Sequence, residues 1–165
     1  MNAVASSSTA MNAVASSSTA MNAVASSSTA MNAVAGSSIA MSKICKVQNA
    51  SITVAEKIQS YRTRVITALS NTSLFSKKTL TIGDGAGTFT DGINTNTFYI
   101  PINCYDDNDT DYTVYYGCKD SLSIVTSSKH SGTITLSQGI SLRGVKVVGV
   151  GSSRGNVGFD VYTAL

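Results

Sequence analysis

Met-Asn-Ala-Val-Ala-Ser-Ser-Ser-Thr-Ala, residues 1–10, is the stretch that decides the fold, because the chain consists of four copies of it up to residue 40. The first three copies of this decad are identical, and the fourth differs only at Gly36 and Ile39 before Met41 opens a diverging fifth copy. All five methionines of the protein fall on the same ten-residue period. An exact repeat gives each unit the same contacts as the unit before it, so the sequence predicts an elongated shaft.

The composition of the decad favours a helix. It has no Pro and no charge, and it is rich in Ala and Met, which favour helix. Its apolar positions recur at spacings of three and four residues, and this seam continues past the repeat, which predicts a coiled coil. Two other interpretations stay open. Each decad could form one turn of a β-solenoid, although the turn residues expected at its corners are missing. The repeat could also be a flexible Ser/Ala-rich spacer. The predicted oligomer seam comprises Met11, Val14, Met21, Val24, Met31, Val34, Met41, Ile44, Val47, Val54, Ile58, Tyr61 and Val65.

The chain divides into three predicted parts, a decad shaft over residues 1–43, a heptad coiled-coil helix over 44–76 and a β domain over 77–165. After Phe75 the sequence turns to short alternating or β-branched segments separated by Gly-, Asp- and Ser-rich turns. This pattern predicts an antiparallel β-sandwich or jelly roll, so the expected fold class is α+β. We expect the last strand, Val157 to Thr163, to pair with the preceding strand across residues 151–156.

Charge is absent before Lys43, and the following segment carries basic residues against Glu56 alone. These charges are scattered around the seam, so we interpret them as a solvated face rather than as a nucleic-acid site. Ser-Ser-Ser-Thr interrupts each apolar cluster of the repeats, so neither a transmembrane helix nor membrane insertion is predicted. A basic start followed by a continuous apolar region is missing, so we expect no signal peptide and synthesis in a host cytoplasm.

Residue types typical of catalytic and metal sites are sparse. Cys45, Cys104 and Cys118 are an odd number without a Cys-x-x-Cys spacing, which indicates buried thiols rather than a disulfide framework or zinc site. Cys104 and Cys118 are candidates to face each other across a hairpin. His130 is the only histidine, and paired aspartates occur in Gly-rich turns, where Asp is common for backbone reasons. We therefore expect neither an enzyme nor a cofactor.

The densest charged cluster is acidic and lies among tyrosines. Asp107, Asp109 and Asp111 have the spacing of the first, third and fifth residues of a calcium-binding loop. The sixth position is Tyr instead of Gly and the twelfth is Cys instead of Glu. We therefore interpret the cluster as an exposed acidic turn and predict no metal. Aromatic and acidic groups on loops can stack on sugars and hydrogen-bond to them, although Tyr in strands is also ordinary sheet packing. The predicted binding residues are Tyr105, Asp107, Asp109, Asp111, Tyr112 and, in a second turn, Arg154.

Decads of the Ser-Ser-Thr-Ala-Met-Asn-Ala-Val type resemble those of tailed-bacteriophage fibre and appendage proteins. The resemblance covers Met1 to about Ile44, and no motif of the β domain adds to it. It implies a homotrimeric virion fibre whose β head attaches to a glycan or protein of the host cell surface. An alternative is a capsid or neck appendage whose β domain anchors to other virion proteins while the repeats project as a spacer. A bacterial adhesin stalk is disfavoured, because export signals are missing.

Overall fold

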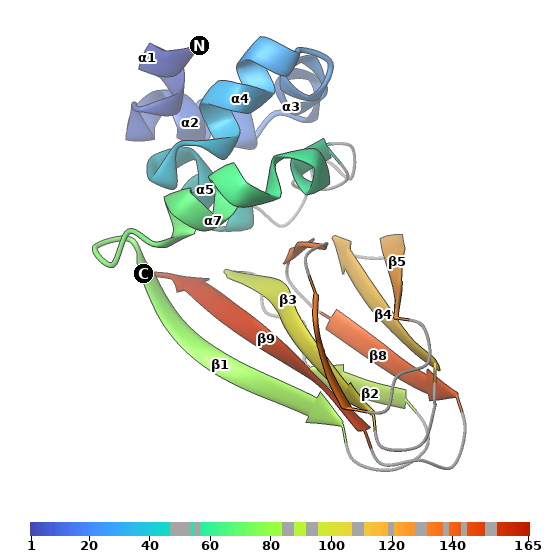
Figure 1. Ribbon diagram of the computed structural model, residues 1–165. Coiled ribbons are helices and arrows are strands. Elements are labelled where there is room, and N and C mark those ends of the chain that lie inside the picture. The colour runs from blue at the N-terminus through green and yellow to red at the C-terminus, as the bar shows by residue number, and fades with distance from the viewer. Residues whose placement is uncertain are drawn as a thin grey trace.

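The computed structural model describes residues 1–46, 54, 57–83, 88–91, 96–106, 111–118, 121–127, 132–136, 139–142, 145–150 and 155–165. The fold is mixed helix and strand. A helical layer built from the N-terminal part of the chain lies over one end of two antiparallel sheets (Figure 1). Among the described residues, no helix has the length and apolar character needed to cross a bilayer.

In the described part of the chain, the helical layer consists of short helices that recur with the decad period, followed by two further helices after the repeats. Their bounds are α1 Asn2–Ala5, α2 Ser8–Ala15, α3 Ser18–Ala25, α4 Ser28–Ala35, α5 Ser38–Lys46, the 3-10 helix η1 Ile58–Tyr61 and α7 Arg62–Leu69. The chain turns sharply between successive decad helices instead of continuing in one direction (Figure 1).

Serine side chains begin and end these helices. The Ser7, Ser17 and Ser27 hydroxyls accept hydrogen bonds from the backbone N–H three residues ahead, at 3.3, 3.2 and 3.3 Å. At the other end, the Ser16 and Ser26 hydroxyls donate to the carbonyl four residues earlier, at 2.7 and 2.8 Å. Because Ser satisfies backbone groups locally, it favours helix ends over helix interiors. Each Ser-Ser pair therefore ends one helix and begins the next.

Methionine forms the centre of the stack. Met11, Met21, Met31 and Met41 are at most 1% exposed. Each decad helix contacts the next one, and α1 also contacts α4 while α2 contacts α5. The Ser37 hydroxyl, between α4 and α5, donates to the Ala5 carbonyl at the end of α1. Helices this short are not stable alone in water, so the stack of α1–α5, called here the decad solenoid, is held by these contacts.

The predicted continuous coiled coil is therefore wrong. The spacing of three and four residues marked the apolar face of each short helix, but that face packs against other helices of the same chain. Most residues of the predicted seam are buried within this single chain. The buried ones are Met11, Met21, Val24, Met31, Val34, Met41, Ile44, Val54, Ile58 and Val65. Val14 and Tyr61 are half-buried, and Val47 lies outside the described residues. Of the predicted helix over 44–76, the described residues include the end of α5, η1 and α7, and strand β1 already begins at Phe75, while residues 47–53 and 55–56 lie outside the description.

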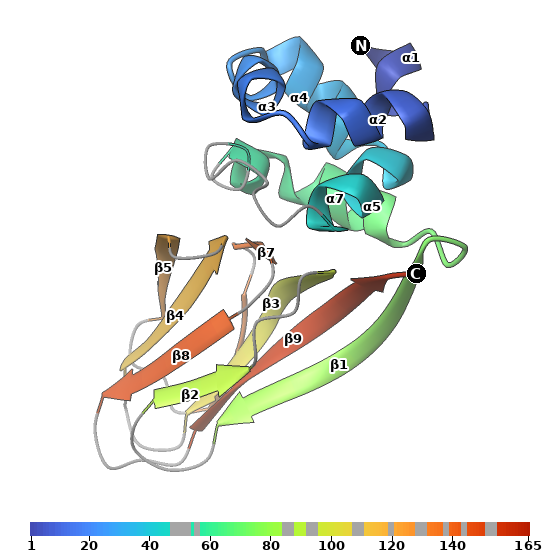
Figure 2. The ribbon, with the colours of Figure 1, turned by 180° about the vertical axis from the view of Figure 1, so that it is seen from behind.

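The two sheets are antiparallel and separate in their hydrogen bonding. The first has the order β1 (Phe75–Gly83), β9 (Gly155–Ala164), β3 (Thr97–Asp106) and β6 (Gly132–Thr135), and β7 (Ser141–Leu142) also pairs with β3. The second has the order β2 (Thr88–Asp91), β8 (Val145–Val150), β4 (Asp111–Cys118) and β5 (Ser121–Ser127). Figure 2 shows both sheets from behind, with the helical layer over the ends of β3 and β9.

Two predicted strand pairings are wrong. The last strand, β9, lies between β1 and β3, whereas the preceding β8 belongs to the other sheet. Residues on both faces of β9 are buried, such as Phe159 and Tyr162, which suits a central strand. Cys104 stands opposite Ile134 and Val157 in the first sheet, and Cys118 stands opposite Ser121 in the second, so these cysteines do not share a hairpin.

Candidate functional site

Side chains of η1 and α7 join the helical layer to the sheets. The Gln59 amide exchanges two hydrogen bonds with the backbone of Ile140, its nitrogen donating and its oxygen accepting, both at 2.7 Å. The Arg62 guanidinium donates to the carbonyls of Gly139, at 3.2 Å, and Pro101, at 2.9 Å. Gly139 has a φ of 90°, a conformation that other residues rarely adopt. These contacts, called here the joint, fix the orientation of the helices on the sheets.

Burial changes the pKa values of two groups in the helical layer. Partial burial lowers the pKa of Arg62, and the nearby Asp160 carboxylate opposes this effect. Burial raises the pKa of the Cys45 thiol to about 12, against the opposing charge of Lys46. The thiolate is the nucleophilic form of cysteine, so Cys45 is inert at neutral pH. The Cys45 sulfur instead lies 3.4 Å from the Ser42 carbonyl and 3.7 Å from that of Asn96.

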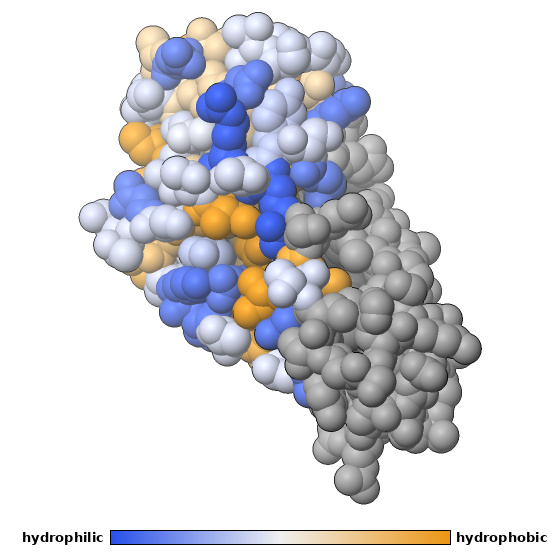
Figure 3. All heavy atoms as spheres, viewed as in Figure 1, coloured by the Kyte–Doolittle hydropathy of each residue, from blue (hydrophilic) through white to orange (hydrophobic). Residues whose placement is uncertain are grey.

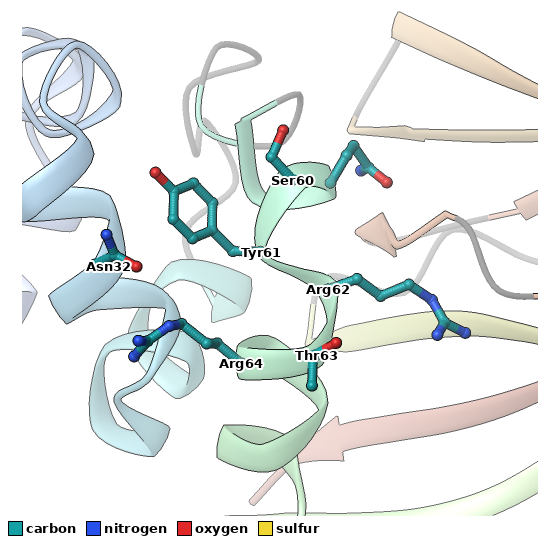
Figure 4. A pocket seen from close by; sticks show the side chains of 7 residues that line it. Asn32, Ser60, Tyr61, Arg62, Thr63 and Arg64 are labelled. Atoms are coloured by element: carbon teal, nitrogen blue, oxygen red, sulfur yellow. The ribbon is translucent and has the colours of Figure 1, made fainter.

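Two adjoining hollows lie beside α4 and share Asn32 and Arg64. One, about 340 Å³, lies between α4 and the η1–α7 segment, and the other, about 270 Å³, extends past Gly36 to α1. In Figure 4 the side chains of Tyr61 and Arg64 extend toward Asn32, whereas Arg62 extends the opposite way, over the strands. We call the two hollows together the Arg64 groove.

The Arg64 groove coincides with a departure from the repeat. Gly36 replaces the serine of the earlier decads, and a Cβ there would lie 3.4 Å from the Asn32 carbonyl and 3.7 Å from Nη1 of Arg64. None of the described residues lining either hollow is an acid, a histidine or a cysteine. The groove offers guanidinium, amide and hydroxyl groups, which suit an anion or a hydroxyl-rich ligand.

One end of the decad solenoid is less covered than the other. At the fourth and tenth decad positions, Val4 of α1, two residues of α2 and Ala20 of α3 are half-exposed, whereas Val24 of α3 and the matching residues of α4 and α5 are buried. The half-exposed set, called here the open face, is Val4, Ala10, Val14 and Ala20, and the buried equivalents are Ala30, Val34, Ala40 and Ile44. Figures 1 and 2 place α1, α2, α3 and α4 at the end of the molecule opposite the sheets, with α5 and α7 between them and the sheets.

The surface of the helical layer is weakly polar. In Figure 3 the part of this face over the helices is mostly pale to light orange, as expected for Ser, Thr and Ala. The five described charges of this layer are all basic, namely Lys43, Lys46, Lys57, Arg62 and Arg64. Three of them, Lys46, Lys57 and Arg64, are exposed, and the other two are half-buried. The Lys46 ammonium donates to the carbonyl of Leu165.

The predicted binding residues are divided between the sheets. Tyr105 lies in β3 of the first sheet, while Asp111 and Tyr112 begin β4 of the second. Asp107, Asp109 and Arg154 lie outside the described residues. Among the described residues no group of three His, Cys, Asp or Glu side chains could hold a metal ion. A binding role for these residues stays a prediction.

The Arg64 groove was not predicted from the sequence. Arg64 was interpreted as one of several scattered basic residues, and no role was predicted for Asn32. One signal was available, because Gly36 is the first departure from an otherwise exact repeat. The contact between α4 and α7 that brings Gly36 and Arg64 together is tertiary and has no counterpart in the local sequence.

Comparisons with known proteins return little. No protein-family model matches this chain, and no curated protein matches it either. Among solved structures, the chain is similar to one from a study titled "Bacillus endospore appendages form a novel family of disulfide-linked pili". The identity is 11%, the TM-score is 0.40, and the match covers 55% of this chain and 88% of that chain. A likeness at that TM-score carries no conclusion about this protein.

Proposed function

We propose that the chain is a non-enzymatic structural protein of a phage virion. In this proposal the decad solenoid docks the protein onto an assembly, and the two sheets form a head turned toward the host cell surface. The resemblance of the decads to those of phage fibre and appendage proteins supports the virion role. The two sheets are further proposed to pack face to face as a β-sandwich.

The joint is the observation that carries this proposal. One cluster of buried side chains continues from Ala5 in the first decad to Phe98, Ile140 and Tyr162 in the sheets. The four hydrogen bonds of Gln59 and Arg62 reinforce it. A shared core and satisfied polar contacts oppose hinge motion between modules. An appendage that presents a head in a fixed direction requires such a coupling.

The polarity of the molecule favours docking through the solenoid. The open face is apolar and uncharged and lies opposite the sheets. Exposed apolar surface is typical of a contact site. The alternative, in which the sheets anchor to the virion, lacks a corresponding described surface. A homotrimer remains part of the proposal, but its contacts must lie outside the predicted seam, which is used within one chain.

Immunogold electron microscopy tests the virion role. Antibodies raised against the purified chain would be applied to particles purified from cells that produce it. The proposal expects gold at a fixed place on the particle, such as the tail tip or the capsid surface. Particles without label, with the chain left behind in the lysate, would contradict it.

Adsorption competition tests which end faces the host. An excess of purified chain should reduce adsorption of the particles to their host cells if the head binds the surface. Arg64→Gln and Tyr112→Ala variants then distinguish the Arg64 groove from the predicted tyrosine surface, since only the variant in the contact should lose competition. Absence of competition by the unmodified chain would favour anchoring through the sheets.

A further inference from the structure

We propose that the Arg64 groove binds an anionic sugar, with a carboxylate or phosphate group at the Arg64 guanidinium and the sugar ring between α4 and the η1–α7 segment. This inference goes beyond the proposed function, because it assigns a ligand to the helical layer instead of the sheets. Its test needs no virion, so it can fail independently of the proposed virion role.

The Arg64 guanidinium is available to an anion. Arg62, two residues earlier, donates its hydrogen bonds to two backbone carbonyls of the joint. Arg64 is exposed and extends the opposite way, toward Asn32 (Figure 4). It forms no ion pair or hydrogen bond with another described residue. Because a guanidinium pairs well with the oxygens of a carboxylate or phosphate, a ligand anion would supply the partner that no described acid supplies.

The departure from the repeat at Gly36 leaves room beside this guanidinium. In the second and third decads, the serine at the same position donates its hydroxyl to the carbonyl four residues earlier. Gly36 offers only its backbone N–H to the corresponding carbonyl of Asn32, at 3.3 Å. A Cβ at residue 36 would lie 3.7 Å from Nη1 of Arg64, so a serine side chain would occupy space beside the guanidinium. The glycine therefore keeps the proposed anion position open.

The larger hollow suits the remainder of a sugar. Its wall includes the side chains of Asn32, Ser60 and Tyr61, which come from α4 and η1. These amide and hydroxyl groups can donate and accept hydrogen bonds, as sugar hydroxyls do. The volume of about 340 Å³ is near the lower end of the range for ligand pockets, about 300–1,000 Å³, which fits a single sugar unit. A neutral sugar would leave the guanidinium unpaired, and a bare anion would leave the hydroxyl and amide groups unused.

Nuclear magnetic resonance titration of the full chain tests the inference. The probes are glucuronate, galacturonate and glucose 6-phosphate. Glucose, acetate and inorganic phosphate are the controls for the neutral ring and the bare anion. We expect at least one probe to bind at least about tenfold more tightly than every control and to shift the amide signals of Asn32 and Arg64. Preference for the uronates would identify a carboxylate ligand, and preference for the sugar phosphate would identify a phosphate ligand.

Three variants locate the bound anion. Arg64→Gln removes the charge and should weaken binding at least about tenfold. Gly36→Ser restores the repeat and fills the space beside the guanidinium, so it should also weaken binding, with circular dichroism showing that the chain stays folded. Lys57→Gln is the matched control, since Lys57 is an exposed base of the same layer that borders neither hollow. It should bind like the unmodified chain.

Three results would overturn the inference. The first is no binding of any of the three anionic sugars, and the second is equal binding by Arg64→Gln and the unmodified chain. The third is equal binding of the anionic sugars and of acetate or phosphate. In that case the groove would accept any anion, such as an acidic side chain of another protein.

Discussion

Helices α2 and α4 have the same eight-residue sequence, Ser-Thr-Ala-Met-Asn-Ala-Val-Ala, and differ in what surrounds them. In both helices the methionine is buried and the serine before the helix caps it. Val14 of α2 is half-exposed, however, whereas Val34 of α4 is fully buried. The local sequence thus determines where each helix begins and which side faces the centre of the stack. Position in the solenoid determines whether its remaining apolar side is covered.

The largest difference between the two helices is expected from an acid at the valine position. Val34→Asp places a carboxylate in a fully buried position without a partner, so we expect it to lower the free energy of unfolding by about 3 kcal/mol or more. Val14→Asp keeps its carboxylate within reach of water and should cost about 1 kcal/mol or less. Urea unfolding followed by circular dichroism measures both. Equal losses in the two variants would mean that α1 and α2 are as covered as α4 and α5.

Methionine truncation should affect the two helices alike. Met11 and Met31 are 0% and 1% exposed, so Met11→Ala and Met31→Ala should each cost about 2–5 kcal/mol through lost burial and cavity formation. The same unfolding measurement applies, with the exposed Asn12→Ala as control. A loss below about 1 kcal/mol in Met11→Ala would show that the first turn of the solenoid is not packed as described.

Removing a cap should have a smaller effect. Ser27→Ala deletes the acceptor for the Ala30 N–H at the start of α4 and should cost about 1 kcal/mol. Ser28→Ala, at the next and exposed position, is the matched control and should stay within about 0.5 kcal/mol of the unmodified chain. Thermal unfolding of the unmodified chain and the two variants measures these differences in stability. If both variants behave alike, the helix break between α3 and α4 does not depend on the Ser27 cap.

Restoring the repeat at residue 36 should have the smallest effect. Gly36 has ordinary right-handed backbone angles, and a Cβ there would make only van der Waals contacts. Gly36→Ser should therefore stabilise the chain by about 0.5 kcal/mol, because it reduces the freedom of the unfolded chain. A loss of more than about 1 kcal/mol would indicate that Arg64 needs the space that Gly36 leaves.

The sequence predicted helix in the decads, the change to strands near residue 75 and the apolar side of each short helix. It did not predict that the chain turns at each Ser-Ser pair. The Ser hydroxyl competes with the backbone helix pattern, and this local effect was not weighed against the apolar spacing. Once the helices are short, the spacing of three and four residues describes packing within one chain, so periodicity alone could not identify the partner.

Strands were easier to predict than their pairing. The alternating segments at residues 79–82, 97–102, 112–116 and 145–150 all lie within strands, while the short β2 and β7 were missed. The order β1-β9-β3 depends on contacts between residues far apart in the sequence. The Arg64 groove was missed for the same reason, because α4 and α7 meet only in the folded chain.

The central claim is that the decads fold back on themselves within one chain. Spin labels at Ser6→Cys and Asn32→Cys, both exposed and both lining the same hollow, test it by double electron–electron resonance. Cys104 and Cys118 would be replaced by Ser, and Cys45 is protected by burial and by its pKa of about 12. The stacked helices predict a distance of about 20 Å or less, since packed helix axes lie about 10 Å apart. A continuous helix would separate the labelled residues by about 39 Å, at about 1.5 Å per residue, and that result would contradict the account.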